Sequence, residues 1–148
     1  MKKFVIVYPS KASETVKRAV EILCKTLQSY TSECPICLCG ADAIDAGTCR
    51  VIYLGTKDSC EYIKKNSAVS LFVPEEYSIN VKNEVVMIEG FDDAGVLYGA
   101  IDFYNRYVIK FVHKNNDMSY CINFFEHDTL PEFEYRSAPT AKERGLWT

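Results

Sequence analysis

The residues most able to do chemistry in this sequence are its seven cysteines, three of which lie in the stretch CPICLC (34–39). Cys34, Cys37 and Cys39, together with Cys49, could supply the thiolates that hold zinc in a tetrahedron. If residues 34–39 form a strand, however, Cys37 and Cys39 share one face while Cys34 points to the other, so the thiols do not converge. We therefore expect buried structural cysteines here, with metal binding or redox switching as the alternative.

Carboxylates are the next candidates, and they occur in close pairs along the chain: Glu75 and Glu76, Asp92 and Asp93, and Glu132 and Glu134. Hydrolysis of a glycosidic bond needs two carboxyl groups that face each other across the substrate. Neighbours in sequence on strands or helix caps do not face each other in this way. We expect solvated or capping roles for these pairs.

Histidines and glycines complete the search for catalytic motifs. His113 and His127 are the only histidines, and no GxSxG motif lies near either. Gly90, Gly95 and Gly99 match neither GxGxxG nor GxxxxGK[ST], and Asp92 and Asp93 put negative charge where a phosphate would bind. We expect helix capping and packing at these glycines, and no catalytic residue, no metal and no cofactor in this chain.

Composition narrows the class of protein further. The chain has 148 residues, 48% of them hydrophobic and 25% charged, which is typical of one globular domain. A formal net charge of −3 gives no positive field for nucleic acid. MKKFVIVYPS offers too few apolar residues for a signal peptide, and no stretch is long enough to span a membrane. We expect a cytoplasmic protein with reduced thiols and no nucleic-acid or membrane partner.

Hydrophobic periodicity predicts the elements that must position these residues. Strands are expected at 2–8, 49–55 and 120–128, with a shorter one at 34–40, and an amphipathic helix at 14–30 after an N-cap at Ser13. Residues 58–66 give a weak helix signal, and residues 67–74 fit either a strand or an extended loop.

The sequence from 77 to 108 gives the clearest local pattern. Apolar alternation on both sides of Lys82 and Asn83 predicts a β-hairpin with strands at 77–82 and 84–90. A helix should follow from an Asp92 or Asp93 cap to about Val108, and Gly95 and Gly99 lie on one face of it, held close to the sheet. Together these elements predict an α+β fold: a two-layer α/β sandwich with a mixed sheet of about five strands and two main helices.

Residues 75–108 resemble the accessory domain that precedes the catalytic barrel in family 20 hexosaminidases and in α-glucuronidases. That domain has strands of the type Y-x-I-x-V and V-x-I-x-G, then a helix opening with D-x-x-G-x-x-Y-G. The matching residues here are Tyr77, Ile79, Val81, Val86, Ile88, Gly90, Asp92, Gly95, Tyr98 and Gly99. The resemblance implies a fold like the second domain of those hexosaminidases.

The tail of the chain resembles the same enzymes. A P-x-F-x-x-R segment that crosses to the barrel is matched by Pro131, Phe133 and Arg136, and the R-G-L-W strand that begins the barrel is matched by residues 144–147. The family's catalytic carboxylates lie on the barrel, which takes about 250 residues and does not fit after Arg144.

The resemblance therefore implies a non-catalytic accessory domain at 1–137, followed by a linker and the start of a truncated barrel at 138–148. Its partner would be the catalytic barrel of the same polypeptide, and it would meet carbohydrate only through that parent enzyme. The residues expected at the interdomain contact are Tyr98, Tyr104, Arg136, Arg144 and Trp147. Residues after about Ser137 should be disordered, or docked on a neighbouring copy, when the barrel is absent. The alternative is an independent ligand- or protein-binding module.

Overall fold

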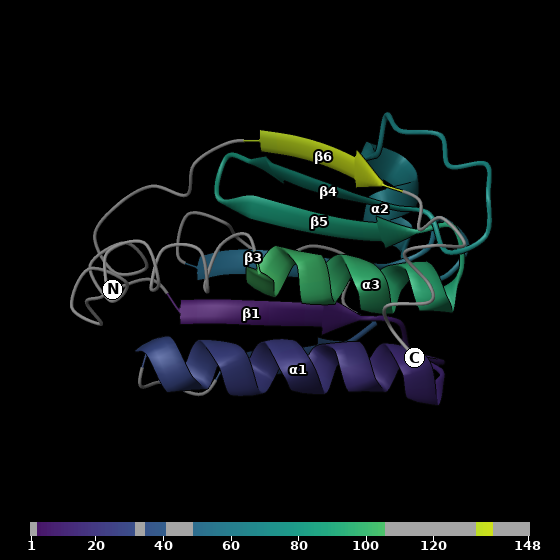
Figure 1. Cartoon of the computed structure of the whole chain (residues 1–148). Coiled ribbons are helices and arrows are strands. Elements are labelled where there is room, and N and C mark those ends of the chain that lie inside the picture. Colours follow the sequence, from purple (N-terminus) through teal and green to yellow (C-terminus); the bar gives the residue numbers. More distant parts are fainter. Residues whose placement is uncertain (1–2, 32–34, 41–48, 106–132, 138–148) are drawn as a thin grey trace.

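The computed structural model describes residues 3–31, 35–40, 49–105 and 133–137, which form one mixed sheet and three helices (Figure 1). The strands are β1 (Lys3–Tyr8), β2 (Ile36–Cys39), β3 (Cys49–Gly55), β4 (Tyr77–Lys82), β5 (Val85–Gly90) and β6 (Phe133–Ser137). The helices are α1 (Glu14–Thr31), α2 (Glu61–Asn66) and α3 (Asp93–Phe103).

The sheet has the strand order β2-β1-β3-β5-β4-β6. The pairs β1/β2, β1/β3 and β3/β5 are parallel, whereas β4 is antiparallel to both β5 and β6. The expectation of a mixed sheet is therefore confirmed, with β4 entering through a hairpin.

The helices cover the two faces of the sheet unequally. Helices α1 and α3 lie side by side on one face, where Phe4, Ile6, Ile52 and Leu54 join the larger core cluster. Alternate residues of the same strands point to the other face, where a smaller cluster forms around Ile63 of α2. In the part of the chain that the structure describes, no helix is long and apolar enough to cross a bilayer.

The expected architecture holds with two corrections. The predicted strand at 49–55 and helix at 14–30 are confirmed, and Ser13 caps α1 by accepting a hydrogen bond from Val16 N at 3.3 Å. The sheet has six strands where about five were expected, because residues 133–137 pair with β4 although they had been interpreted as an extended tail. The short helix α2 also adds to the second face of the sheet. The predicted strand at 120–128 and the helix end near Val108 lie outside the described residues.

The hairpin turn lies one residue later than expected. Its two central residues are Asn83 and Glu84, with φ angles of 53° and 66°. Two consecutive left-handed residues indicate a type I′ turn, whose twist matches that of the strands. Asn accepts this conformation readily and Glu does not, but the Glu84 carboxylate pairs with the buried Arg50 guanidinium at 2.8 Å. This ion pair ties the turn to β3.

The glycines of α3 lie close to the sheet, as their spacing predicted, Gly95 against backbone atoms and Gly99 against side chains. A Cβ on Gly95 would lie 2.4 Å from the carbonyl oxygen of Glu76, and a Cβ on Gly90 would lie 2.4 Å from the amide nitrogen of Val96. A Cβ on Gly99 would lie 2.7 Å from the side chain of Ile88. Helix α3 therefore packs on the β4–β5 hairpin at a distance that only glycine permits.

We predict that Gly95→Ala lowers the free energy of unfolding by about 2 kcal/mol. Overpacking against a backbone atom costs about 1–3 kcal/mol or more, which exceeds the gain of about 1 kcal/mol from replacing glycine in a helix. Gly99→Ala is the matched control and should cost less, because its Cβ would meet the γ2 methyl group of the Ile88 side chain and not a backbone atom. Urea denaturation of both variants tests this, and a Gly95→Ala protein more stable than the wild type would show that the contact is loose.

Candidate functional surfaces

Helix α3 carries apolar side chains on all of its sides, which is unusual for a helix on a protein surface. Val96, Ala100 and Phe103 are buried against the sheet. On the outer sides, Leu97, Tyr98, Ile101 and the capping residue Tyr104 are half-buried, and Leu97, Tyr98 and Tyr104 also pack against the core cluster. We call these four residues the outer α3 row. The row includes both tyrosines predicted for the interdomain contact.

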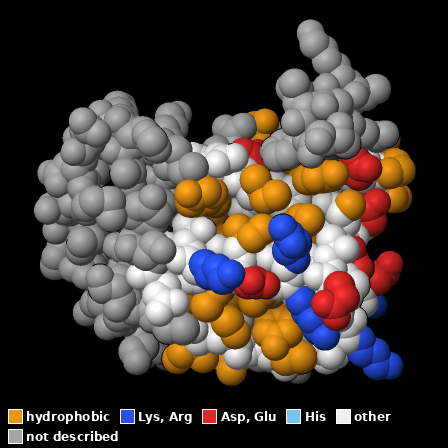
Figure 2. Space-filling view, turned by 60° about the horizontal axis from the view of Figure 1, so that its bottom comes forward, with side chains coloured by type: hydrophobic (Ala, Val, Ile, Leu, Met, Phe, Trp, Pro, Cys, Tyr) orange, Lys and Arg blue, Asp and Glu red, His pale blue; other side chains and the backbone are white. Residues whose placement is uncertain are grey.

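Helix α1, which lies beside α3, has an ordinary surface. Its outer side carries charged residues, including the exposed pairs Lys17–Glu14 and Lys25–Glu21. Figure 2 shows these charges as a band on the helix-covered face, with apolar side chains gathered beside the band. The contrast marks α3 as the helix with an outer side suited to burial.

Arg136 of β6 lies in a cluster at the end of the sheet. Its Nε donates to Oε2 of Glu76 at 2.9 Å, and its guanidinium lies 5.6 Å from the ring centroid of Phe72. The Arg136 side chain is 45% exposed, so one side of it still faces solvent. Within this domain, Arg136 joins β6 to the loop before β4. The contact of Arg136 with a following domain stays a prediction.

Glu76 corrects the expectation that this carboxylate is solvated. It is buried, and its Oε1 accepts hydrogen bonds from the amides of Phe72 at 2.7 Å and Val73 at 3.4 Å. Burial alone raises the pKa of Glu76, but the bonds from Phe72, Arg136 and Val73 outweigh it and hold the pKa below its ordinary value. The stability that Glu76 contributes is therefore present at neutral pH and is lost as the pH falls.

Asp92 confirms the expected capping role. It accepts from the amide of Gly95 at 2.9 Å at the start of α3, and also from the amide of Glu75 at 3.3 Å. Glu134 is exposed, and Glu132 lies outside the described residues. The two carboxylates Glu76 and Asp92 thus hold the loop before β4 against both β6 and α3.

The end of the sheet near this loop exposes large apolar side chains. Phe72 is 72% exposed and Phe91 is 44% exposed, and the amides of both residues bond to oxygen atoms of Glu76. Ser137, the last described residue, pairs with Tyr77 at the same end. Arg144 and Trp147, the other two predicted contact residues, lie outside the described part of the chain.

The cysteines of CPICLC are not buried as expected. Cys37 and Cys39 are free and exposed on the edge strand β2, and Cys34 lies outside the described residues. The alternation was predicted correctly, because Leu38 packs toward the smaller core cluster. The burial was wrong because β2 is an edge strand that α1 covers only in part. In the ranges that the structure describes, no group of three or more His, Cys, Asp or Glu residues could hold a metal.

Tyr77 joins the two halves of the motif that runs from β4 to α3. Its hydroxyl donates to Oδ2 of Asp102 on α3 at 2.6 Å, and its side chain lies beneath Gly99. Burial first, and then the bond to the Asp102 carboxylate, raise the pKa of Tyr77 well above its ordinary value. The tyrosine and the glycine of the motif are thus partners in one contact.

We predict that Tyr77→Phe lowers the free energy of unfolding by about 1–3 kcal/mol, because a hydrogen bond to a charged group is lost. Tyr62→Phe is the matched control, since its ring keeps its stacking on Tyr53 while its hydroxyl faces a surface cleft. Urea denaturation at neutral pH measures both variants. Equal stability of Tyr77→Phe and wild type would mean that the bond to Asp102 contributes nothing.

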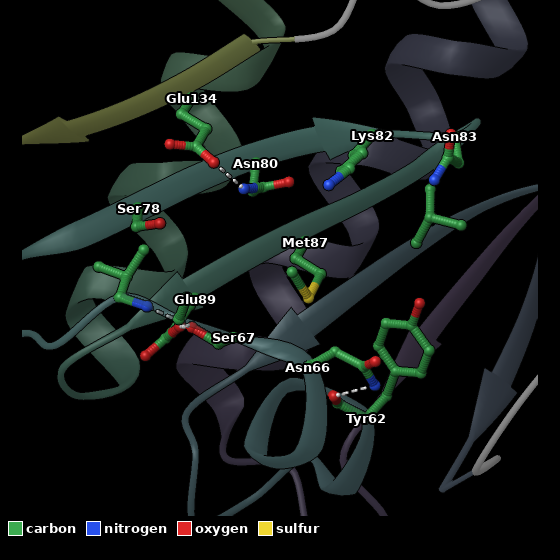
Figure 3. A pocket seen from close by; sticks show the side chains of 13 residues that line it. Tyr62, Asn66, Ser67, Ser78, Asn80, Lys82, Asn83, Met87, Glu89 and Glu134 are labelled. Atoms are coloured by element: carbon green, nitrogen blue, oxygen red, sulfur yellow. Dashed lines mark hydrogen bonds between the residues drawn. The ribbon is translucent and has the colours of Figure 1, made fainter.

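A polar cleft of about 470 Å³ lies on the sheet face opposite α1 and α3 (Figure 3). Its floor is made by alternate residues of the hairpin strands, and its wall by α2 and the segment that follows it. The polar side chains that line it are Tyr62, Asn66, Ser67, Ser78, Asn80, Lys82, Asn83, Glu89 and Glu134. The cleft exists because α2 is short and, in the described part of the chain, no other helix covers β4, β5 and β6 on this face.

Glu89 is the buried charge of the cleft. Its side chain is 4% exposed, the Ser67 hydroxyl donates to its Oε1, and the Lys57 ammonium lies 3.9 Å from its Oε2. Burial raises the pKa of Glu89 above its ordinary value of 4.5, and the bond from Ser67 and the charge of Lys57 offset only part of this. Glu89 is therefore costly to keep ionised where it lies.

We predict that Glu89→Gln gains stability relative to the wild type as the pH rises from about 4.5 to 7. The unfolded chain releases the Glu89 proton before the folded chain does, so wild-type stability falls across this window, whereas glutamine does not titrate. Urea denaturation at both pH values gives the difference. Glu134→Gln, at an exposed position on the same cleft, should change the folding free energy little. A constant difference between Glu89→Gln and wild type would contradict the prediction.

The sequence reasoning did not identify the cleft, although a signal for it was present. Ser78, Asn80 and Lys82 alternate with the core residues of β4, and this polar half of the pattern points to the second face. The missing information was that α2 would leave this face open. Glu134 reaches the cleft from β6. It is 54 residues from Asn80 in sequence, so no local sequence pattern could have predicted that the two lie together.

Comparison with known proteins shows where this fold occurs. No family model and no curated protein matches the chain. Among solved structures, it is similar to a family GH115 4-O-methyl-α-glucuronidase with specificity for decorated arabinogalactans, at 18% identity and a TM-score of 0.61. It is also similar to a GH138 enzyme targeting pectin rhamnogalacturonan II, at 19% identity and a TM-score of 0.50.

The extent of these matches is as informative as their scores. Each covers 93% of this chain, but the chain spans only 18% of the GH115 enzyme and 15% of the GH138 enzyme. The fold of this chain is therefore one that occurs as a small part of larger glycoside hydrolases. The two enzymes come from families other than the family 20 hexosaminidases, and at these identities the likeness shows the fold alone.

Proposed function

We propose that this chain is a non-catalytic accessory domain of a glycoside hydrolase, and that it packs against a (β/α)₈ catalytic barrel of the same polypeptide. The observation that carries the proposal is the likeness of 93% of the chain to a segment making up 18% of an α-glucuronidase. α-Glucuronidases are one of the two enzyme groups that residues 75–108 resemble. In this role the domain spans 1–137, and residues 138–148 lead into the barrel.

The apolar side chains of the outer α3 row also support the proposed packing against a barrel. A helix that is apolar all round is typical of one that is covered on both sides. The row contains Tyr98 and Tyr104, the two tyrosines expected at the interdomain contact, together with Leu97 and Ile101. Arg136 and the exposed Phe72 would extend the contact toward the point where β6 ends. Arg144 and Trp147 would belong to the first strand of the barrel.

The barrel would supply the catalytic carboxylates and the contact with carbohydrate. A cytoplasmic location is part of the proposal, because Cys37 and Cys39 are exposed free thiols that suit a reducing compartment. The polar cleft favours a second function for the same domain, the binding of a ligand, which does not need the barrel.

We predict that Ile101→Lys leaves the isolated chain within about 0.5 kcal/mol of wild-type stability but destabilises the contact in the parent polypeptide. Ile101 is half-exposed and is not part of the core cluster, whereas a buried unpaired lysine at an interface is costly. Ile22→Lys on α1 is the matched control, since Ile22 is also half-exposed on a helix and outside the cluster.

The experiment has two parts. Reading the gene beyond the codon of Thr148 should show an open frame of about 250 residues or more with alternating strand and helix patterns. Thermal unfolding and limited proteolysis of that longer polypeptide should then separate Ile101→Lys from Ile22→Lys. A stop codon directly after Thr148, or equal behaviour of the two variants, would overturn the proposal.

A further inference from the structure

The buried carboxylate of Glu89 on the floor of the cleft is not explained by packing against a barrel. A charged group with a 4% exposed side chain lowers stability unless it is well paired, and among the described residues its ion-pair partner, Lys57, lies 3.9 Å away. The cross-strand neighbour of Glu89 is Ser78, whose side chain also lines the cleft. A costly buried acid beside a hydroxyl in a concave site is typical of a site that binds something.

The charges around the cleft select against an ionic ligand. Glu89 and Glu134 contribute two carboxylates, while Lys82 lines the cleft and Lys57 lies beside Glu89. Over the ranges that the structure describes, these two negative and two positive groups balance, so the cleft has no net charge that favours an anion or a cation. The ligand that fits this balance is neutral.

The remaining lining residues offer hydrogen bonds of both senses, with the apolar side chains of Val85 and Met87 among them. The Asn80 amide nitrogen donates to Oε1 of Glu134 at 3.0 Å. The side-chain oxygen of Asn80 can accept a hydrogen bond from a ligand. Lys82 adds a donor, and Ser78 can act in either sense. Met87 lies on the floor between the polar groups, and Tyr62 forms the far side (Figure 3).

We propose that this cleft is a binding site for a neutral saccharide. Sugar hydroxyls both donate and accept, which matches the mixture of amides, hydroxyls and carboxylates, and the C–H faces of a sugar ring can pack on Met87 and Tyr62. The volume of about 470 Å³ lies within the range of ligand sites, about 300–1,000 Å³. The site binds and breaks no bond. It departs from the expectation that carbohydrate is met only through the parent enzyme, and it does not rest on the accessory-domain proposal.

The test uses the 148-residue chain and three neutral disaccharides: cellobiose, xylobiose and N,N′-diacetylchitobiose. Titration followed by ¹H–¹⁵N NMR should give saturable shifts for at least one of them, gathered in residues 66–69, 78–83 and 87–89. Glucuronic acid and inorganic phosphate are the charged comparators and should cause no saturable shift in these residues.

Variants locate the site. Asn80→Ala should weaken binding about tenfold, because it removes a hydrogen-bonding amide from the cleft without touching the core. Asn105→Ala, at an exposed asparagine after α3, is the matched control and should bind as the wild type does. If Asn80→Ala does not give a folded spectrum, the exposed Lys82 takes its place as Lys82→Ala, with the same expected direction.

Three results would each overturn the proposal. The first is the absence of saturable shifts with all three disaccharides. The second is a set of shifts that maps outside the cleft or survives Asn80→Ala unchanged. The third is saturable binding of glucuronic acid or phosphate alone, which would show that the cleft selects a charged ligand.

Discussion

The contact on which most of the structure depends is that of α3 with the β4–β5 hairpin, backbone against backbone. Gly95 faces the Glu76 carbonyl and Gly90 faces the first turn of the helix. Helix α3 and the hairpin cannot come closer without a clash, and they cannot separate without losing these contacts. The distance set by this contact lets the Tyr77 hydroxyl reach Asp102 and lets Asp92 bond to the loop before β4. In close packing of this kind, contacts between backbone atoms fix the position of α3 on the sheet.

The consequences extend from the helix to both candidate surfaces. Because α1 and α3 lie side by side on the sheet (Figure 1), the outer α3 row belongs to the same face of the domain as the outer side of α1. Because the loop before β4 is held by Glu76 and Asp92, Phe72 is presented to solvent beside Arg136. The surface proposed to meet a barrel is thus positioned by hydrogen bonds that are internal to the domain.

Local sequence patterns predicted those parts of the fold that local interactions determine. The hairpin, α1 and the start of α3 follow from alternation, from helical spacing and from caps at Ser13 and Asp92. Features that depend on distant partners were missed. Residues 133–137 pair with β4 only through the tertiary fold, Glu76 is buried because Arg136 and two amides reach it, and Cys37 is exposed because β2 is an edge strand. The turn at Glu84 was misplaced because its left-handed conformation is supported by Arg50, a residue on another strand.

The cleft and the core are built from the same two strands, with alternate side chains assigned to opposite faces. Ile79, Val81, Val86 and Ile88 hold the helices, while the residues between them line the open face. Changes at Asn80, Lys82 or Met87 can therefore alter what the open face recognises while the packing beneath α3 is unchanged. Substitutions on the open face can change the ligand that such a domain binds with little effect on its stability. Relatives with this backbone therefore need not share a ligand.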